Sequence, residues 1–512
     1  MKIFLEKASS VLYQNRDKFV FPIFFIFTFF QYGLVNISRL GLISDDWDTF
    51  RAVFLLNSKS VSDAFDFFLW QSGPYLIQRP FWLTIMPLQI GFFQGNIALY
   101  FIVNVFIFSL ACWFFYNFFT AVLGSKEVAF FAILLFICAP FHTASLYWIS
   151  AQMSLFSLLF ISIAMYFSIK YSIFYSTFLS YLFAFISILV YENSIALMPL
   201  IVLVILFSKE SFYKKVIYVL PYPLGLFSYL LFKRTALVFI NATEFVKEAS
   251  LIRSDSLKLM LEQITLFSNF FFGPDALKFV SDILRNYRDL IVLEYFSSVL
   301  LLLVAFLYLL YTLYVYVRKK YHSSKYLCDV PPISRWILYF SFILSFFVPV
   351  IGNYSTSSAP MGDRINLPHL LLLATLGSAI ILDKARVLGL KVIFLFLLFF
   401  TIMNNISLAH YIRASELQLE FAEFIKHTEI SENTLINLST DIRTYKGIPV
   451  LDNIWTRTYI ISNYKNLYNV ETDIDYDRFS TDGSTIKYQS ILSPTRFFSD
   501  PAIIDITYFR NQ

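Results

Sequence analysis

The feature that most constrains this chain is a series of apolar segments of roughly 17–25 residues, each long enough to cross a bilayer as a helix. Hydrophobic residues make up 58% of the 512 residues and charged residues 15%. A soluble domain carries about 25% charged residues, so these segments do not fit the buried core helices of a soluble protein. We therefore predict an all-α polytopic membrane protein.

Basic residues give the apolar segments a direction. Lys and Arg gather in the predicted turns on one side of the membrane, whereas the short turns on the other side have few. Arg16 and Lys18 precede the first segment. Basic loops tend to stay in the cytoplasm, which puts the N-terminus inside and the C-terminal end outside. We expect about eleven transmembrane helices, with amphipathic helices in the outer loops. The spans are predicted over residues 19–35, 97–123, 128–140, 153–169, 178–190, 195–207, 216–232, 290–317, 336–351, 367–382 and 392–406.

The chain changes character near residue 407, where polar residues become frequent and apolar runs become short. We predict a transmembrane domain over 1–406 and a small extramembrane module over 407–512. The module is expected to begin with a helix at 414–426 and to continue as an α/β or β-rich unit. The three cysteines offer neither a disulfide framework nor a zinc-ligand spacing. The first apolar run lacks a cleavage site of small residues, so we expect it to remain as an anchor.

Three carboxylates, Asp45, Asp46 and Asp48, follow the first predicted span directly. A carboxylate at a membrane surface can take a proton from a hydroxyl if its neighbours tune its pKa, and mutual repulsion raises the pKa of one member. Asp46 and Asp48 could also bind a divalent cation through their oxygens, although the pattern makes no cofactor certain. The structural alternative is that Asp46 caps a surface helix that begins near Trp47.

Two arginines in the predicted outer loops are candidates for a lipid-phosphate contact. Arg79 lies in the first outer loop, and Arg364 follows Asp363 in a late one. A guanidinium binds phosphate through two parallel hydrogen bonds, which suits either residue for this role. The alternatives are an interfacial anchor for Arg79 and a surface ion pair between Arg364 and Asp363.

Other polar side chains interrupt the apolar runs at their outer ends. Glu192 separates two apolar runs. Insertion of a carboxylate at membrane depth costs roughly 2.5–3.5 kcal/mol, which favours a functional role for Glu192. The alternative is a short turn in water. His142, Trp148 and Gln152 lie in the outer turn after the third span. They could contact a phosphate, a sugar hydroxyl or a pyranose ring, and the alternative is an interfacial aromatic belt.

Several functional classes lack their sequence signatures here. The chain has no Gly-rich phosphate loop, no HExxH and no GxSxG motif. A cytoplasmic nucleotide-sugar donor therefore has no visible binding site. The basic residues are scattered over inner turns instead of forming a patch, which argues against a nucleic-acid partner.

The acidic pair Asp45-Asp46 after the first span, the long outer loop behind it and the Arg79-Pro80 step before the second span resemble the GT-C superfamily of integral-membrane glycosyltransferases. The resemblance covers residues 19–199. It implies a first-loop aspartate as catalytic base, with Asp45 and Asp46 both eligible. The sequence departs from the family pattern at Trp47-Asp48, which leaves the choice between the two aspartates open.

The same resemblance implies the partners and the location. The donor is expected to be a polyprenyl-phosphate-linked sugar. By analogy with O-antigen modification, the sugar is expected to be glucose. The acceptor is expected to be a hydroxyl of a surface glycan or lipid. Glu192 is expected to line the active cavity, on the periplasmic face of a bacterial inner membrane. The alternatives are a surface-polysaccharide polymerase and a lipid or glycan flippase without chemistry.

Overall fold

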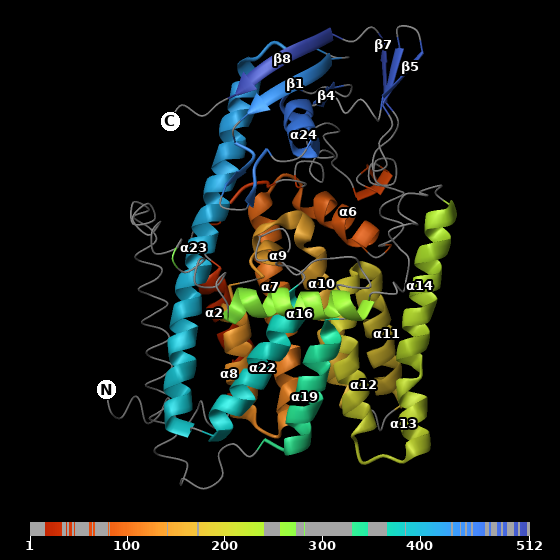
Figure 1. The fold of residues 1–512 in the computed structure, drawn as a ribbon, viewed down its shortest axis with the longest axis vertical. Coiled ribbons are helices and arrows are strands. Elements are labelled where there is room, and N and C mark those ends of the chain that lie inside the picture. Colours follow the sequence, from red (N-terminus) through yellow and green to blue (C-terminus); the bar gives the residue numbers. More distant parts are fainter. Residues whose placement is uncertain are drawn as a thin grey trace.

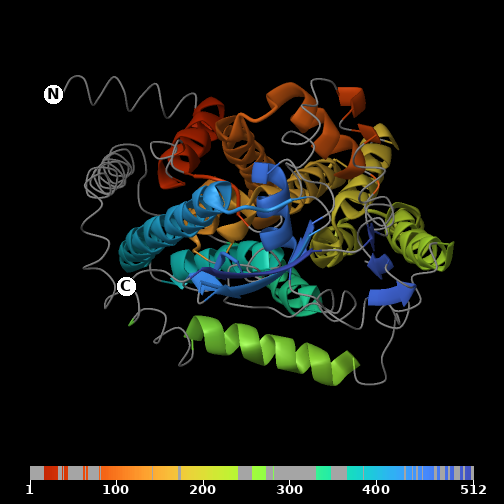
Figure 2. The ribbon, with the colours of Figure 1, turned by 90° about the horizontal axis from the view of Figure 1, so that it is seen from above.

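The computed structural model is predominantly helical, with the helices side by side in a bundle and strands at one end of it (Figure 1). Seen from above, the strands lie over the bundle (Figure 2). The residues described are 16–32, 37, 40–43, 46, 61–63, 65–66, 80, 82–140, 142–170, 174–239, 256–272, 281, 330–346, 366–384, 386–431, 434–440, 442–445, 448–451, 454–465, 470–472, 479–482, 485–488, 496–499 and 502–508.

The bundle is built from helices joined by turns, and it includes two 3₁₀ segments (η2 and η3). The helical elements are α2 (Arg16–Gln31), α6 (Trp82–Phe93), α7 (Ile97–Leu123), α8 (Lys126–Cys138), α9 (Ala144–Tyr147), η2 (Ile149–Ala151), α10 (Met153–Ser168), α11 (Phe174–Val190), η3 (Glu192–Leu197), α12 (Met198–Leu206), α13 (Phe212–Val219), α14 (Pro221–Phe239), α16 (Ser256–Phe272), α19 (Pro332–Ser345), α22 (Leu367–Lys384), α23 (Arg386–His427) and α24 (Ile454–Lys465).

Four helical stretches in the described part of the chain are long and apolar enough to cross a membrane, by length and composition. Shorter apolar helices coincide with further predicted spans, for example Leu367–Leu382. This confirms the helical fold class and is compatible with a membrane protein. The predicted span at 290–317 lies outside the described residues. The four long stretches are Ile97–Leu123, Ile149–Ser168, Phe212–Phe232 and Leu388–His427.

The turn between α7 and α8 shows how the sequence sets helix ends. Gly124 adopts a left-handed conformation (φ 65°) directly after α7, which a residue with a side chain rarely adopts. Ser125 then caps α8, because its hydroxyl accepts a hydrogen bond from the Val128 N–H at 3.3 Å. Glu127 in the first turn of α8 complements the positive end of the helix dipole.

Aromatic side chains hold the bundle together. The buried ring of Phe24 in α2 stacks on Phe130 of α8, with 5.5 Å between centroids, and meets Tyr116 of α7 edge-on at 6.0 Å. Such pairs stabilise by about 0.5–1.5 kcal/mol beyond their buried area. The main hydrophobic core of the described residues extends from α2 through α23 to the C-terminal strands.

A proline pair divides the predicted span at 216–232 into two helices. α13 ends at Val219, and α14 begins at Pro221. Proline has no N–H to donate, so the hydrogen-bond ladder is interrupted at Pro221 and Pro223.

α23 corrects the prediction of two helices near the C-terminal end of the bundle. A span at 392–406 and a separate helix at 414–426 were expected, whereas α23 runs without a break from Arg386 to His427. The sequence has no Gly or Pro between residues 390 and 427 to end it. No Asp, Glu, Lys or Arg lies between Lys391 and Arg413, a stretch of roughly 30 Å at about 1.5 Å per residue.

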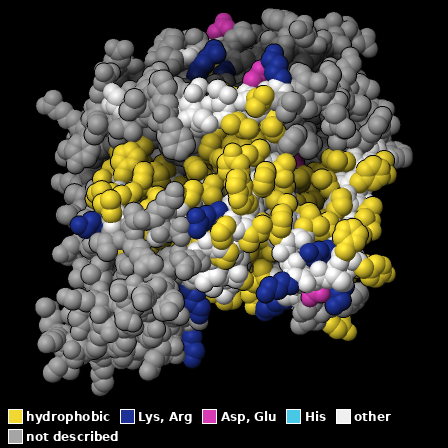
Figure 3. Space-filling model, turned by 60° about the horizontal axis from the view of Figure 1, so that its bottom comes forward, with side chains coloured by type: hydrophobic (Ala, Val, Ile, Leu, Met, Phe, Trp, Pro, Cys, Tyr) yellow, Lys and Arg dark blue, Asp and Glu magenta, His cyan; other side chains and the backbone are white. Residues whose placement is uncertain are grey.

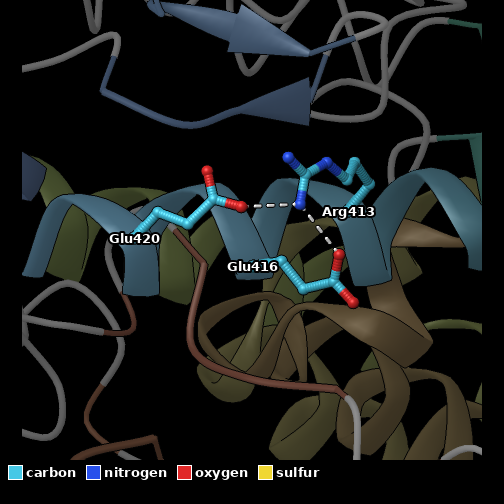
Figure 4. Close-up of polar contacts among 3 residues, drawn as sticks. All are labelled: Arg413, Glu416 and Glu420. Carbon is cyan, nitrogen blue, oxygen red and sulfur yellow. Dashed lines mark hydrogen bonds and ion pairs between the residues drawn. The ribbon is translucent and has the colours of Figure 1, made fainter. Parts of the chain in front are cut away.

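Beyond this stretch, α23 carries a ladder of charges. Arg413 donates to the carboxylate of Glu416 at 3.0 Å and to that of Glu420 at 2.8 Å (Figure 4). Exposed pairs of this kind contribute little stability, about 0–1 kcal/mol. Their position shows where the apolar face of α23 gives way to a polar one.

The C-terminal strands pack on the end of α23. Three strands form a parallel sheet in the order β4-β1-β8, and Tyr508 of β8 lies 5.1 Å from Phe421 of α23 between ring centroids. The Gln418 amide donates to the Val450 carbonyl at 2.7 Å. The strands are β1 (Thr434–Thr440), β2 (Thr444–Tyr445), β3 (Ile448–Pro449), β4 (Val470–Thr472), β5 (Phe479–Asp482), β6 (Thr485–Tyr488), β7 (Arg496–Ser499) and β8 (Ala502–Tyr508).

α16 lies across the bundle helices instead of along them (Figure 1). Its buried residues Met260 and Phe267 pack on Phe342 of α19 and on Phe346. Exposed polar residues such as Lys258 and Glu262 occupy another side. This amphipathic arrangement agrees with the surface helices expected in the second outer loop.

Two glycines test the packing between α22 and α23. A Cβ at Gly389 would lie 2.5 Å from the backbone oxygen of Ile381, whereas a Cβ at Gly377 would meet nothing within 4 Å. We expect Gly389→Ala to destabilise the protein by about 1–3 kcal/mol, because the helices must separate. Gly377→Ala, the control, should stabilise by roughly 0.5–1 kcal/mol. Thermal unfolding in detergent measures both, and equal melting temperatures would contradict this account.

Candidate functional site

Asp46 ties the segment after α2 to the outer turn before α10, 104 residues later in the chain. Its side chain is fully buried. Oδ1 accepts hydrogen bonds from the backbone N–H and the hydroxyl of Ser150, both at 2.7 Å. Oδ2 accepts from the N–H groups of Ile43 at 3.1 Å and Ile149 at 3.3 Å. These four bonds fix the position of Asp46 against the turn that contains Ile149 and Ser150.

The four bonds also decide what Asp46 can do. An ionised carboxylate offers about four acceptor positions, and four protein donors occupy those of Asp46. A substrate hydroxyl would have to displace one of them. The arrangement therefore suits a carboxylate that positions its neighbours better than one that takes a proton itself.

Two opposing effects set the pKa of Asp46. Burial disfavours the charged form and raises the pKa from 3.8 to about 7, although the hydrogen bonds from Ser150, Ile43 and Ile149 lower it. Asp46 therefore changes its charge near neutral pH.

α23 flanks the same segment. A Cβ at Gly41 would lie 2.2 Å from the Ser415 hydroxyl, so the backbone at Gly41 runs directly against α23. Ser415 follows Arg413, the residue that ends the uncharged stretch of α23. The segment with Asp46 thus lies level with the end of an apolar stretch long enough to span a bilayer.

His142 is held between aromatic rings beside this turn. Its imidazole is buried, with ring centroids 5.3 Å from Phe108 and 5.4 Å from Phe136. Burial lowers the pKa of His142 to about 3, so the ring is neutral. The Tyr32 hydroxyl donates to the Ile137 carbonyl and lies 2.7 Å from His142 Nε2, which makes Nε2 the protonated nitrogen. A neutral imidazole brings no charge to the phosphate contact that was predicted for it.

The outer turn 142–154 gathers polar atoms that lack partners. His142 Nδ1, the Ser145 and Ser154 hydroxyls, the Tyr147 hydroxyl and both amide atoms of Gln152 are buried and have no hydrogen-bond partner among the described residues. A buried polar atom left unsatisfied costs about 1–3 kcal/mol. Such atoms normally bind water or a ligand, so this turn suits a polar, uncharged group.

The other predicted residues in the described part of the chain are also buried. Trp148 precedes η2, and its ring forms part of the core, so it offers no open face for stacking on a sugar in this structure. Glu192 is buried at the first position of η3. The Ser157 hydroxyl supports that position, 2.8 Å from the carbonyl oxygen of Tyr191.

The remaining predicted site residues cannot be located in the structure. Asp45, Asp48, Arg79 and Arg364 lie outside the described residues. Within the described ranges no three His, Cys, Asp or Glu side chains come together as a possible metal site. Asp46 has its acceptor positions occupied by protein donors, which argues against the predicted cation site with Asp48.

Sequence reasoning missed Ser150 and Tyr32, the partners of Asp46 and His142. Ser150 is a serine in an apolar outer turn, and Tyr32 is an aromatic residue at the end of an apolar helix. Neither type is unusual there. The only available signal was their place at the outer ends of predicted spans, next to the acidic cluster and the His142 turn.

Replacement of Asp46 tests the role of its four bonds. Asp46→Asn puts an amide nitrogen, which cannot accept a hydrogen bond, against two donors. We expect a loss of about 2–4 kcal/mol in unfolding free energy, because two buried donors lose their acceptor. Ser150→Ala removes one hydroxyl donor alone and should cost about 1 kcal/mol. Thermal unfolding in detergent gives both values, and a smaller loss for Asp46→Asn than for Ser150→Ala would refute the assignment.

The raised pKa of Asp46 predicts a pH dependence of stability. Between pH 3.8 and about 7 the folded state holds the proton more tightly than the unfolded state. The contribution of this group to stability is therefore fully present below pH 3.8 and is lost as the pH rises through about 7. The melting temperature of wild type minus that of Asp46→Asn should fall between pH 5 and pH 8. A constant difference would mean that the pKa is not raised.

Neither a protein-family model nor a curated protein matches this chain.

Proposed function

We propose that the protein is an integral-membrane glycosyltransferase of the GT-C type. It transfers a sugar from a polyprenyl-phosphate donor to a hydroxyl of a surface glycan or lipid at the outer face of the bacterial inner membrane. The observation that carries the proposal is the Asp46 carboxylate, which is buried and bonded to the 149–150 turn. Burial of a carboxylate is costly. A buried carboxylate that holds Asp46 against this turn therefore supports a functional role for the acidic pair.

Asp45 is the proposed catalytic base. Asp45 is the sequence neighbour of Asp46 and the other member of the acidic pair. Asp45 takes the proton of the acceptor hydroxyl, whose oxygen forms a bond to C1 of the sugar. The bond between C1 and the phosphate oxygen breaks, and the phosphate leaves with the electron pair. This single displacement inverts the anomeric centre.

Arg79 and Arg364 are the proposed contacts of the leaving phosphate. Negative charge gathers on the phosphate oxygens as the bond breaks, and guanidinium groups aimed at them stabilise that charge. The unpartnered polar atoms of the 142–154 turn are suited to hydroxyl groups of sugar or acceptor. Glu192 is proposed as a further residue of the cavity wall.

The proposed topology has about eleven spans, with 407–512 as an extracytoplasmic module. The apolar helices and the uncharged stretch between Lys391 and Arg413 support it. The packing of the strands on the outer part of α23 supports a module placed close to the site.

Exchange of Asp45 separates a transferase from a flippase. Asp45→Asn should lower sugar transfer by roughly 10²–10⁴-fold, the usual contribution of a general base. The matched control is Asp66→Asn, an exposed aspartate of the same outer segment, which should transfer at the wild-type rate. The measurement is the composition of the surface glycan, by mass spectrometry, in a deletion strain complemented with each variant.

A transferase predicts the loss of one defined sugar with Asp45→Asn. Unchanged glycan with Asp45→Asn would refute the proposal. Loss of whole glycan chains in the deletion strain, with full rescue by Asp45→Asn, would instead identify a flippase.

A further inference from the structure

α13 is exceptional among the described bundle helices because it buries none of its residues. Phe212 and Tyr213 are 81% and 75% exposed, and Val216 and Ile217 are exposed one turn later. The stretch Phe212–Phe232 has 17% of its apolar window buried, against 47–67% for the other three long stretches. The described bundle helices therefore leave this segment uncovered.

α14 contacts the bundle through one side alone. Tyr222 is buried there, with its hydroxyl hydrogen-bonded to Ser180 of α11, and Gly225 lies close to Tyr181. Leu224, Phe227 and Leu231 are exposed on α14. Acyl chains cover such a face in a membrane-spanning helix. α13 carries lysines as well as apolar residues, so acyl chains alone do not match its exposed surface.

Positive charge surrounds the exposed aromatic residues of α13. Lys209 and Lys214 are exposed and Lys215 is half-buried, all within seven positions of the chain. Glu210, the acidic residue among them, pairs with Lys214 at 3.2 Å. Among the described residues, no ion pair involves Lys209 or Lys215.

The surface around this end of the bundle has the same character. With the bottom of the molecule turned forward, Lys and Arg side chains lie around and among a hydrophobic surface (Figure 3). Lys170 and Lys391 are exposed residues at the ends of α10 and α23 on this side. Asp46 and the 142–154 turn lie at the opposite ends of the helices.

We propose that α13 and the preceding turn form a binding site for anionic phospholipid headgroups. Phe212 and Tyr213 enter the boundary between headgroups and acyl chains, and Lys209 and Lys215 reach the phosphates with their apolar stems along the bilayer. A short helix with aromatic residues and lysines, and with no buried face, is the pattern of a segment that lies in this boundary. The site lies away from the proposed transferase centre and does not depend on it.

The test is a lipid titration of the purified full-length chain. Wild-type protein is placed in nanodiscs of phosphatidylcholine with increasing phosphatidylglycerol, and the melting temperature is followed. Phosphatidylglycerol should raise it at 0.1 M salt and much less at 1 M salt, where the screening length falls from about 10 Å to about 3 Å. K209Q/K215Q should weaken the apparent affinity for phosphatidylglycerol by roughly fivefold for each lysine removed.

Two control variants keep the result interpretable. K426Q removes a lysine whose side chain is 43% exposed near the end of α23, beyond its uncharged stretch, and should respond to phosphatidylglycerol as wild type does. K209R/K215R keeps the charge and should also respond normally, which excludes a folding defect at these positions. An unchanged response of K209Q/K215Q would overturn the proposal. Cross-linking of α13 to a second copy in nanodiscs would overturn it too, because a protein contact would then cover this helix.

Discussion

The cost of leaving a polar group unpaired in apolar surroundings governs this structure at every level. It makes the apolar segments helical, because a helix satisfies its own backbone donors and acceptors where no water is present. It also explains the hydroxyls of Ser109 and Ser341, which donate to carbonyl groups four residues earlier in their helices.

Asp46 is the place where this constraint is met by tertiary structure. A buried carboxylate that is bonded to one element alone would be too costly to keep ionised. Ile43 supplies a local donor, and Ile149 and Ser150 supply the distant ones. The carboxylate therefore selects one arrangement of the first outer segment against the outer turn, and loss of either partner would leave the other with unsatisfied groups.

Local patterns in the sequence were sufficient for much of the fold. The predicted second span, 97–123, has the same bounds as α7. Its C-terminal end is clear because Gly124 ends α7 and Ser125 begins α8. The division between the last span and the following helix was wrong, since a change from apolar to charged residues alters the surroundings of a helix without ending it. α23 contains no residue that would break its hydrogen bonds between 390 and 427.

The candidate site was less accessible to sequence reasoning, because its partners are distant in the chain. The sequence pattern offered the acidic cluster as a base, a cation ligand or a helix cap, but it could not show which groups Asp46 contacts. Those groups include Ser150 and Ile149, which lie more than one hundred positions away. The same holds for His142, whose neutral state follows from the rings of Phe108 and Phe136 packed around it.

A pKa near neutrality does not by itself make Asp46 the base. A general base needs a lone pair that a substrate can reach as well as a suitable pKa. In Asp46 the pKa is raised by burial, and the same burial closes the carboxylate to a substrate. The proposed base, Asp45, is a separate carboxylate, so the burial of Asp46 does not conflict with the proposal.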